Sequence, residues 1–70
     1  MSDDLRQALG RNLRRHRQQL GLSQEQFAEF LGFHRNFVGE LERGKRNPTL
    51  RSVEAYAAML EVEPLDLLRS

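Results

Sequence analysis

Hydrophobic residues recur every three to four positions in short segments of the chain, and polar or charged residues separate them. This spacing is typical of amphipathic helices and not of strands. The first segment follows Ser2 or Asp4, either of which can cap a helix, and Gly21 suits the helix end. Its apolar edge consists of Leu5, Leu9, Leu13 and Leu20.

Two shorter helices are predicted next. Ser23 and Gln26 form a capping-box pattern at the start of one, and Gly32 ends it. After a short turn, the next runs from near Arg35 to Glu42 or Arg43. Their inward positions are Phe27, Ala28 and Leu31 in the first helix, and Val38 and Leu41 in the second.

The remaining chain predicts two further helices. Thr49 caps a fourth, whose inward positions are Leu50, Val53, Tyr56, Ala57 and Leu60. Glu63 and Pro64 begin a short fifth helix, since proline suits the first helical position. We therefore predict an all-α, compact five-helix bundle that forms a single domain over residues 1–70.

The second and third helices form a helix-turn-helix pattern. Ala28 allows the two helices to cross closely, Gly32 suits a left-handed backbone, and Val38 is a stiff buried contact. The outer face of the third helix carries side chains that suit base edges in a major groove. We expect base reading by Arg35, Asn36, Gly39 and Glu40.

The same face could instead be merely solvated, although a glycine inside a short helix costs about 1 kcal/mol relative to alanine. That cost leaves Gly39 unexplained unless the helix backbone must approach something closely. Glu40 is open to two interpretations: it accepts a hydrogen bond from cytosine N4, or it pairs with Arg43. His34 either touches a phosphate or is an imperfect helix cap.

Charge is unevenly distributed although the net charge is only +1. Residues 5–19 hold five arginines and no acid, and residues 52–68 hold four acids and no base. Solvated helix faces explain this distribution, as does a basic face for a polyanion with an acidic flank turned away.

The sequence offers no metal cluster, cofactor motif or nucleophile–base set, since it has no cysteine and only two histidines. We therefore expect that the protein is not an enzyme and binds no cofactor. Without an apolar run or signal segment, we expect no membrane partner and a cytoplasmic location, at the nucleoid when DNA is bound.

Residues 22–28, Gly32 and residues 38–48 resemble the phage repressor and Cro type of helix-turn-helix domain, the XRE family. Residues 34–39 are similar to the subgroup that includes controller proteins of restriction–modification systems. The resemblance implies a lambda-repressor-like fold and a repressor-type transcription regulator on double-stranded DNA. It also implies an ion pair between Arg17 and Glu42, and phosphate contacts by Gln24, Arg43, Lys45, Arg46 and Asn47. Phe37 departs from the subgroup, which often has a tyrosine there.

The leucines at the end of the chain exceed what one face of a short helix can bury. They form either a small core patch or the interface of a two-fold homodimer that would read a palindromic operator. For the dimer we expect contacts by Met59, Leu65 and Leu68. The alternative function is an antitoxin-type module that binds a small protein partner and DNA only secondarily, suggested by this apolar end and by Phe30.

Overall fold

The structure, a computed structural model, describes residues 1–69, which form helices and connecting loops without β-strands. The elements are α1 (Asp3–Gln19), α2 (Gln24–Leu31), α3 (Arg35–Glu42), α4 (Leu50–Leu60) and the 3-10 turn η1 (Pro64–Leu67). The all-α prediction is confirmed, but the predicted fifth helix is wrong, because that segment is one 3-10 turn. Four residues are too few to offset the cost of nucleating an α-helix, and short segments commonly adopt the 3-10 form.

Side-chain caps begin three of the four α-helices at the predicted residues. The Ser2 and Thr49 hydroxyls accept hydrogen bonds from the backbone N–H groups of Leu5 (3.2 Å) and Ser52 (3.1 Å). Ser23 and Gln26 form the reciprocal capping box, with bonds of 3.1 and 2.9 Å. These bonds satisfy N–H groups that a helix N-terminus leaves without partners, so they fix where each helix starts.

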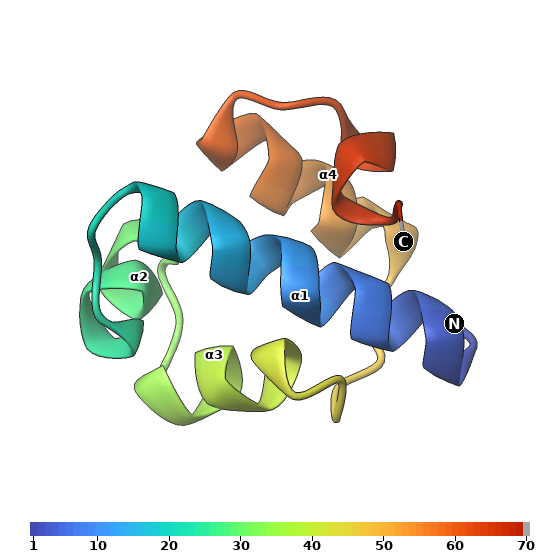
Figure 1. Ribbon diagram of the computed structural model, residues 1–70, viewed down its shortest axis with the longest axis horizontal. Helices are drawn as coiled ribbons and strands as arrows, with labels where there is room; N and C mark the ends of the chain where they lie inside the picture. The colour runs from blue at the N-terminus through green and yellow to red at the C-terminus, as the bar shows by residue number, and fades with distance from the viewer. Residues whose placement is uncertain (70) are drawn as a thin grey trace.

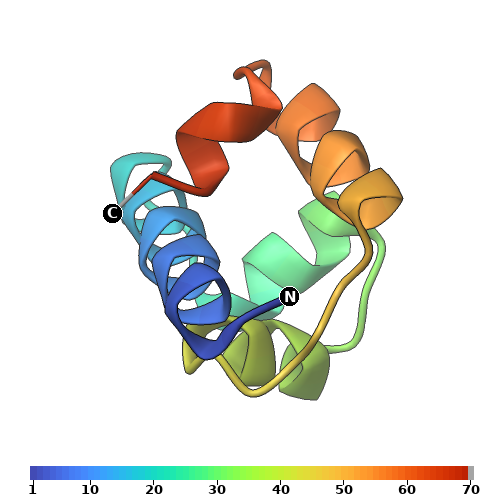
Figure 2. The ribbon, with the colours of Figure 1, turned by 90° about the vertical axis from the view of Figure 1, so that its right-hand side faces the viewer.

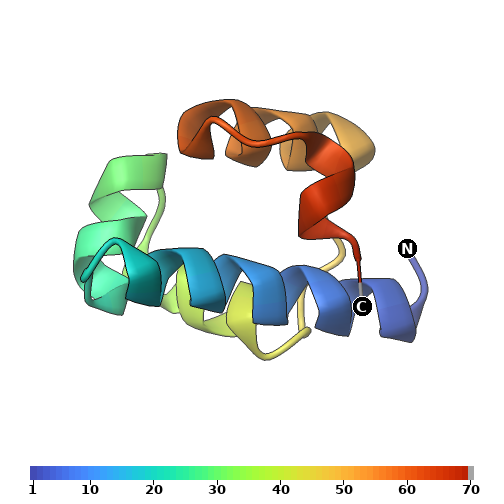
Figure 3. The same cartoon turned by 45° about the horizontal axis from the view of Figure 1, so that its top comes forward.

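α1 runs through the middle of the molecule, with α3 on one side of it and α4 with η1 on the other (Figure 1). α2 lies across one end of α1 and packs against α3, while η1 packs against both α4 and α1. Seen from the side, the elements surround a common interior (Figure 2), and α4 and η1 form a layer above α1 (Figure 3). The helix-turn-helix corner of α2 and α3 is therefore supported on its inner side only.

The interior is filled by apolar side chains from all five elements. The largest fully buried side chains are those of Leu9, Leu13, Phe27, Val38, Leu41, Val53 and Leu67. Three positions predicted on the inward apolar faces are exposed instead: Leu5 at 41%, Leu20 at 52% and Leu50 at 68%. Leu20 follows the last residue of α1 and Leu50 is the first residue of α4, so each lies beyond the part of the helix that neighbouring elements cover.

Two residues of α1 that the sequence analysis did not single out join this helix to the rest of the chain. Gly10 lies where α1 and α3 cross: a Cβ there would come within 2.5 Å of the Leu41 carbonyl oxygen and 2.6 Å of the Glu42 carbonyl oxygen. The buried Asn12 donates from Nδ2 to the carbonyl oxygens of Leu67 (2.9 Å) and Arg69 (2.8 Å). The glycine thus sets how closely α3 approaches, and the asparagine holds η1 and the end of the described chain.

Among residues 1–69, no helix has the length and apolar character needed to cross a bilayer.

Candidate nucleic-acid interface

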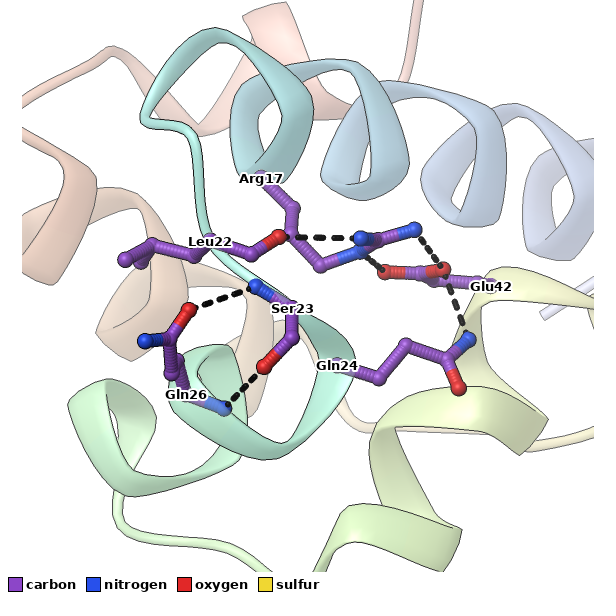
Figure 4. A network of polar contacts seen from close by, with 6 residues as sticks. All are labelled: Arg17, Leu22, Ser23, Gln24, Gln26 and Glu42. Carbon is purple, nitrogen blue, oxygen red and sulfur yellow. Dashed lines mark hydrogen bonds and ion pairs between the residues drawn. The ribbon is translucent and has the colours of Figure 1, made fainter.

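A buried charged network ties α3 to α1 and α2 (Figure 4). Arg17 donates from Nε to Glu42 Oε2 at 2.7 Å and from Nη2 to Glu42 Oε1 at 3.2 Å, and its Nη1 donates to the Leu22 carbonyl at 3.0 Å. Gln24 adds a bond from Nε2 to Glu42 Oε1 at 3.1 Å. The Glu42 side chain is only 4% exposed, so the partners of its carboxylate offset the cost of burying that charge.

Apolar packing fixes the same corner from inside. Ala28 of α2 and Val38 and Leu41 of α3 are all buried. Gly32 ends α2 in the left-handed region with φ 79°, a conformation that glycine adopts without steric cost. With its inner side packed and its end held through Glu42, α3 has one orientation relative to the rest of the domain.

The outer side of α3 is not covered by any other element of residues 1–69 (Figures 1 and 2). Arg35 and Asn36 are exposed on it, near the start of the helix. A shallow depression at the corner between α2 and α3 brings together six of the residues predicted from the sequence. It is lined by Gln24, Arg35, Asn36, Gly39, Glu40 and Arg43.

Gly39 is buried rather than exposed as predicted, and lies at this depression beside longer side chains. A Cβ on Gly39 would lie 3.3 Å from Nη1 of Arg43 and 3.7 Å from Oε1 of Gln24. Because both neighbours are ends of flexible side chains, a methyl group fits here once they shift. The glycine therefore keeps this part of the α3 surface low, and packing does not require it.

Glu40 does not pair with Arg43, one of the two partners considered from the sequence, but with Arg46. Its Oε1 accepts from Nε (3.2 Å) and lies 3.0 Å from Nη2 of Arg46, in the loop after α3. The Arg46 guanidinium also lies over the Phe37 ring, 4.8 Å from its centroid. A cation over an aromatic face is attracted by the ring quadrupole, so two contacts hold Arg46 against the surface of α3.

Arg35 makes a looser pair, 3.6 Å from Glu25 at the start of α2, with both side chains about two-thirds exposed. Such an exposed pair contributes little to stability and opens easily. Arg35 is therefore free to exchange this partner for a ligand.

The residues predicted to contact phosphate lie around the corner in different environments. His34 precedes α3 at its N-cap position without a capping side-chain bond, and Lys45 and Asn47 are exposed in the loop between α3 and α4. Gln24 begins α2, where unpaired backbone N–H groups and the helix dipole favour an anion. One of the two Gln24 amide hydrogens is used by Glu42, which leaves the other for a second partner.

The three residues predicted for a dimer do not form one patch. Met59 lines a depression with Leu20 and Phe30, whereas Leu68 lines another with Met1, Leu5 and Leu50. Leu65, at 67% exposure, lies in η1 and belongs to neither depression.

Several known proteins are similar to this chain in sequence and in fold. Residues 8–70 match the family described as "Helix-turn-helix domain". The chain belongs to the helix-turn-helix family of DNA-binding transcription regulators. Its sequence is 40% identical over 65 residues to the control protein C.SmaI of Serratia marcescens, covering 93% of this chain and 77% of that protein.

Two solved structures are similar as well. The restriction-modification controller protein C.AhdI of Aeromonas hydrophila aligns with a TM-score of 0.75 at 40% identity, over 89% of this chain and 90% of that one. The hypothetical transcription factor NHTF of Neisseria aligns with a TM-score of 0.84 at 37% identity, over 99% and 80% of the two chains. The resemblance drawn from residues 34–39 and the helix-turn-helix pattern is thus confirmed at the level of the family.

Sequence reasoning missed the roles of Gly10, Asn12 and Arg46. Gly10 carried the same signal as Gly39, a glycine in a helix interior, which points to a close approach of backbone. No sequence signal indicates the bonds of Asn12 or the pairing of Arg46 with Glu40, since both join segments whose relative position only the fold determines. Among residues 1–69, no three His, Cys, Asp or Glu side chains gather in a way that could hold a metal ion.

Proposed function

We propose that this helix-turn-helix regulator binds a specific double-stranded DNA sequence by placing α3 in the major groove. One observation carries the proposal: the outer side of α3 is uncovered, and Arg35 and Asn36 are exposed there on a helix whose inner side is rigidly packed. Arginine pairs bidentately with guanine and asparagine with adenine. A rigid support is needed because base recognition depends on placing these groups accurately.

The phosphate contacts come from the periphery of the same corner. We assign them to His34 before α3, to Gln24, which bonds to Glu42 near the end of α3, and to Arg43, Lys45 and Asn47 at and after that end. These contacts fix the position of the domain on the duplex, and the base contacts choose the sequence.

We further propose a homodimer on a palindromic operator. α3 has eight residues and is therefore about 12 Å long, which spans about four base pairs. The described residues extend 27 Å along their longest axis, whereas successive turns of one groove are about 34 Å apart. A single copy therefore reads one half-site, and two copies related by a two-fold axis read a longer, rarer sequence. We assign the contact between copies to Leu65, which is 67% exposed, because Met59 and Leu68 lie in two separate depressions.

Selection of bound duplexes from a random pool tests this proposal. The expected result is a single enriched sequence whose two halves are related by a two-fold axis, together with a dimer mass by light scattering at working concentration. Enrichment of one unsymmetrical half-site would contradict the dimer but leave base reading by α3 standing. Recovery of the pool without any enriched sequence would contradict the specific regulator.

A second candidate function is suggested by the apolar depression of Leu20, Phe30 and Met59, whose exposures are 52%, 39% and 47%. Exposed apolar side chains that cluster in one place are typical of sites for a protein partner. In an antitoxin-type module, this depression would hold a small protein encoded beside the gene. Co-expression of the two proteins should then give a stoichiometric complex that Phe30→Glu disrupts. If the protein purifies without the neighbouring gene product and binds its operator, this function is ruled out.

A further inference from the structure

We propose that Arg46 is a positioning residue that holds the Glu40 carboxylate ready to accept a hydrogen bond from the exocyclic amino group of a cytosine. The inference rests on the proposed function, in which α3 lies in the major groove. It removes Arg46 from the phosphate contacts expected from the sequence and makes it a determinant of sequence preference.

The geometry of the pair leaves one carboxylate oxygen for a ligand. Both Arg46 groups that approach Glu40, Nε and Nη2, point to Oε1, at 3.2 and 3.0 Å. No hydrogen bond within residues 1–69 uses Oε2, and the Glu40 side chain is 37% exposed. Glu40 also lines the depression that contains Arg35 and Asn36. The free oxygen is therefore an acceptor on the surface proposed to read bases.

The charge of Arg46 makes an acidic group acceptable at this place. A carboxylate near DNA is repelled by the phosphates, and an adjacent guanidinium offsets that repulsion over the short distances that salt does not screen. Arg46 is itself held by the Phe37 ring at 4.8 Å, and Phe37 packs edge-on against Phe33 with 4.9 Å between ring centroids. Phe37, which has no hydroxyl to offer a phosphate, thus supports the cation that positions Glu40.

Chemistry favours cytosine over the other bases for this acceptor. In the major groove, cytosine presents the N4 amino donor, whereas guanine and thymine present acceptors that would repel a carboxylate. Adenine also presents a donor at N6, but its N7 acceptor lies beside that group. A carboxylate with a single free oxygen therefore meets the least repulsion at cytosine.

The experiment compares variants on the selected operator, with each base pair replaced in turn by the other three in a competition assay. Arg46→Lys retains the positive charge but loses the planar guanidinium, which approaches Glu40 with two groups while stacked over the Phe37 ring. In this variant we expect the preference for cytosine over the other bases to fall about tenfold at one position per half-site. We expect the same fall at the same position in Glu40→Ala. The double variant should lose no more than either single variant, because both remove one shared interaction.

Lys45→Ala is the matched control from the same loop. As a phosphate contact, Lys45 should affect all sequences alike, and its removal should reduce the salt slope of binding by about 1 without changing any base preference. Both Arg46 and Lys45 are exposed, so neither substitution should affect folding.

The outcomes separate the proposals. If Arg46→Lys keeps the wild-type base preferences, Arg46 acts through charge alone and the inference is overturned, while the proposed function stands. A position that depends on Glu40 but prefers adenine overturns the assignment to cytosine. If the wild-type protein shows no base preference at any position, it is the proposed function that fails.

Discussion

At the residue scale, the two helix-interior glycines have opposite roles. Gly10 faces backbone atoms of α3 that cannot move without moving the helix, whereas Gly39 faces the ends of the Gln24 and Arg43 side chains. Both glycines destabilise their helices by about the same amount. Gly10 allows close packing of α1 against α3, whereas Gly39 determines the shape of the α3 surface.

Substitution of each glycine by alanine should change stability in opposite directions. Gly10→Ala should destabilise the fold by about 1–3 kcal/mol, because forcing α3 away from α1 outweighs the better helix propensity of alanine. Gly39→Ala should stabilise it by up to about 1 kcal/mol through helix propensity, while weakening DNA binding. Urea unfolding measures both values, and a stabilised Gly10→Ala would show that α1 and α3 do not cross as closely as described.

Tyr56 gives the stability of the fold a dependence on high pH. Burial raises the pKa of its hydroxyl above the ordinary value, and a hydrogen bond with the Ser52 side chain offsets only part of this. A raised pKa in the folded state means that the stabilisation is complete below the unfolded-state pKa of about 10 and is lost as the pH rises through the folded-state pKa. As the pH rises above about 10, the free energy of unfolding should therefore fall less for Tyr56→Phe than for the wild type, as measured by urea unfolding. Parallel curves for the two proteins would contradict this origin.

At the element scale, the capped helices could be predicted from the sequence but their coverage could not. Ser2, Ser23 and Thr49 act through bonds to residues three positions away, so local sequence contains the necessary information. Leu20 and Leu50 continue the apolar face of their helices, yet they are exposed because no neighbouring element reaches the helix end. Which part of a face is covered depends on crossing geometry, and periodicity does not contain it.

In the candidate site, too, local contacts could be predicted from the sequence, whereas contacts between distant segments could not. Residues of α2 and α3 that line the depression were predicted because they share one helix-turn-helix corner. For Glu40 the sequence left two interpretations open, a base contact and a pair with Arg43, whereas the structure pairs it with Arg46 of the following loop. A loop conformation of this kind depends on the Phe37 ring and on tertiary packing, neither of which follows from residue spacing.

The buried network between α1, α2 and α3 should be the electrostatic contact whose loss destabilises the fold most. Glu42→Ala leaves the Arg17 guanidinium, 14% exposed, without its carboxylate, and should cost about 3 kcal/mol in unfolding free energy. Arg69→Ala, which removes only the exposed pair with Asp66, is the control and should cost less than about 1 kcal/mol. Equal losses for the two variants in urea unfolding would mean that the network does not fix α3.

At the scale of the whole molecule, the domain separates support from recognition. α4 and η1 lie on the side of α1 opposite α3 and complete the core without approaching the outer face of α3 (Figures 1 and 3). The acidic residues of 52–68 lie in α4, in η1 and in the turn between them, so they lie away from the surface proposed to meet DNA. Charge is thus arranged to favour one docking orientation over the others.

The most direct test of the central claim is to measure the affinity of Arg35→Ala for the selected operator and for a random duplex. The control is Arg69→Ala, which removes one positive charge from the other end of the molecule. We expect Arg35→Ala to weaken operator binding by about 1–3 kcal/mol and to relax preference at one base position, with a much smaller loss on the random duplex. Arg69→Ala should change neither affinity appreciably. Unchanged operator affinity and base preference in Arg35→Ala, or an equal loss in both variants, would show that the outer face of α3 does not read the sequence.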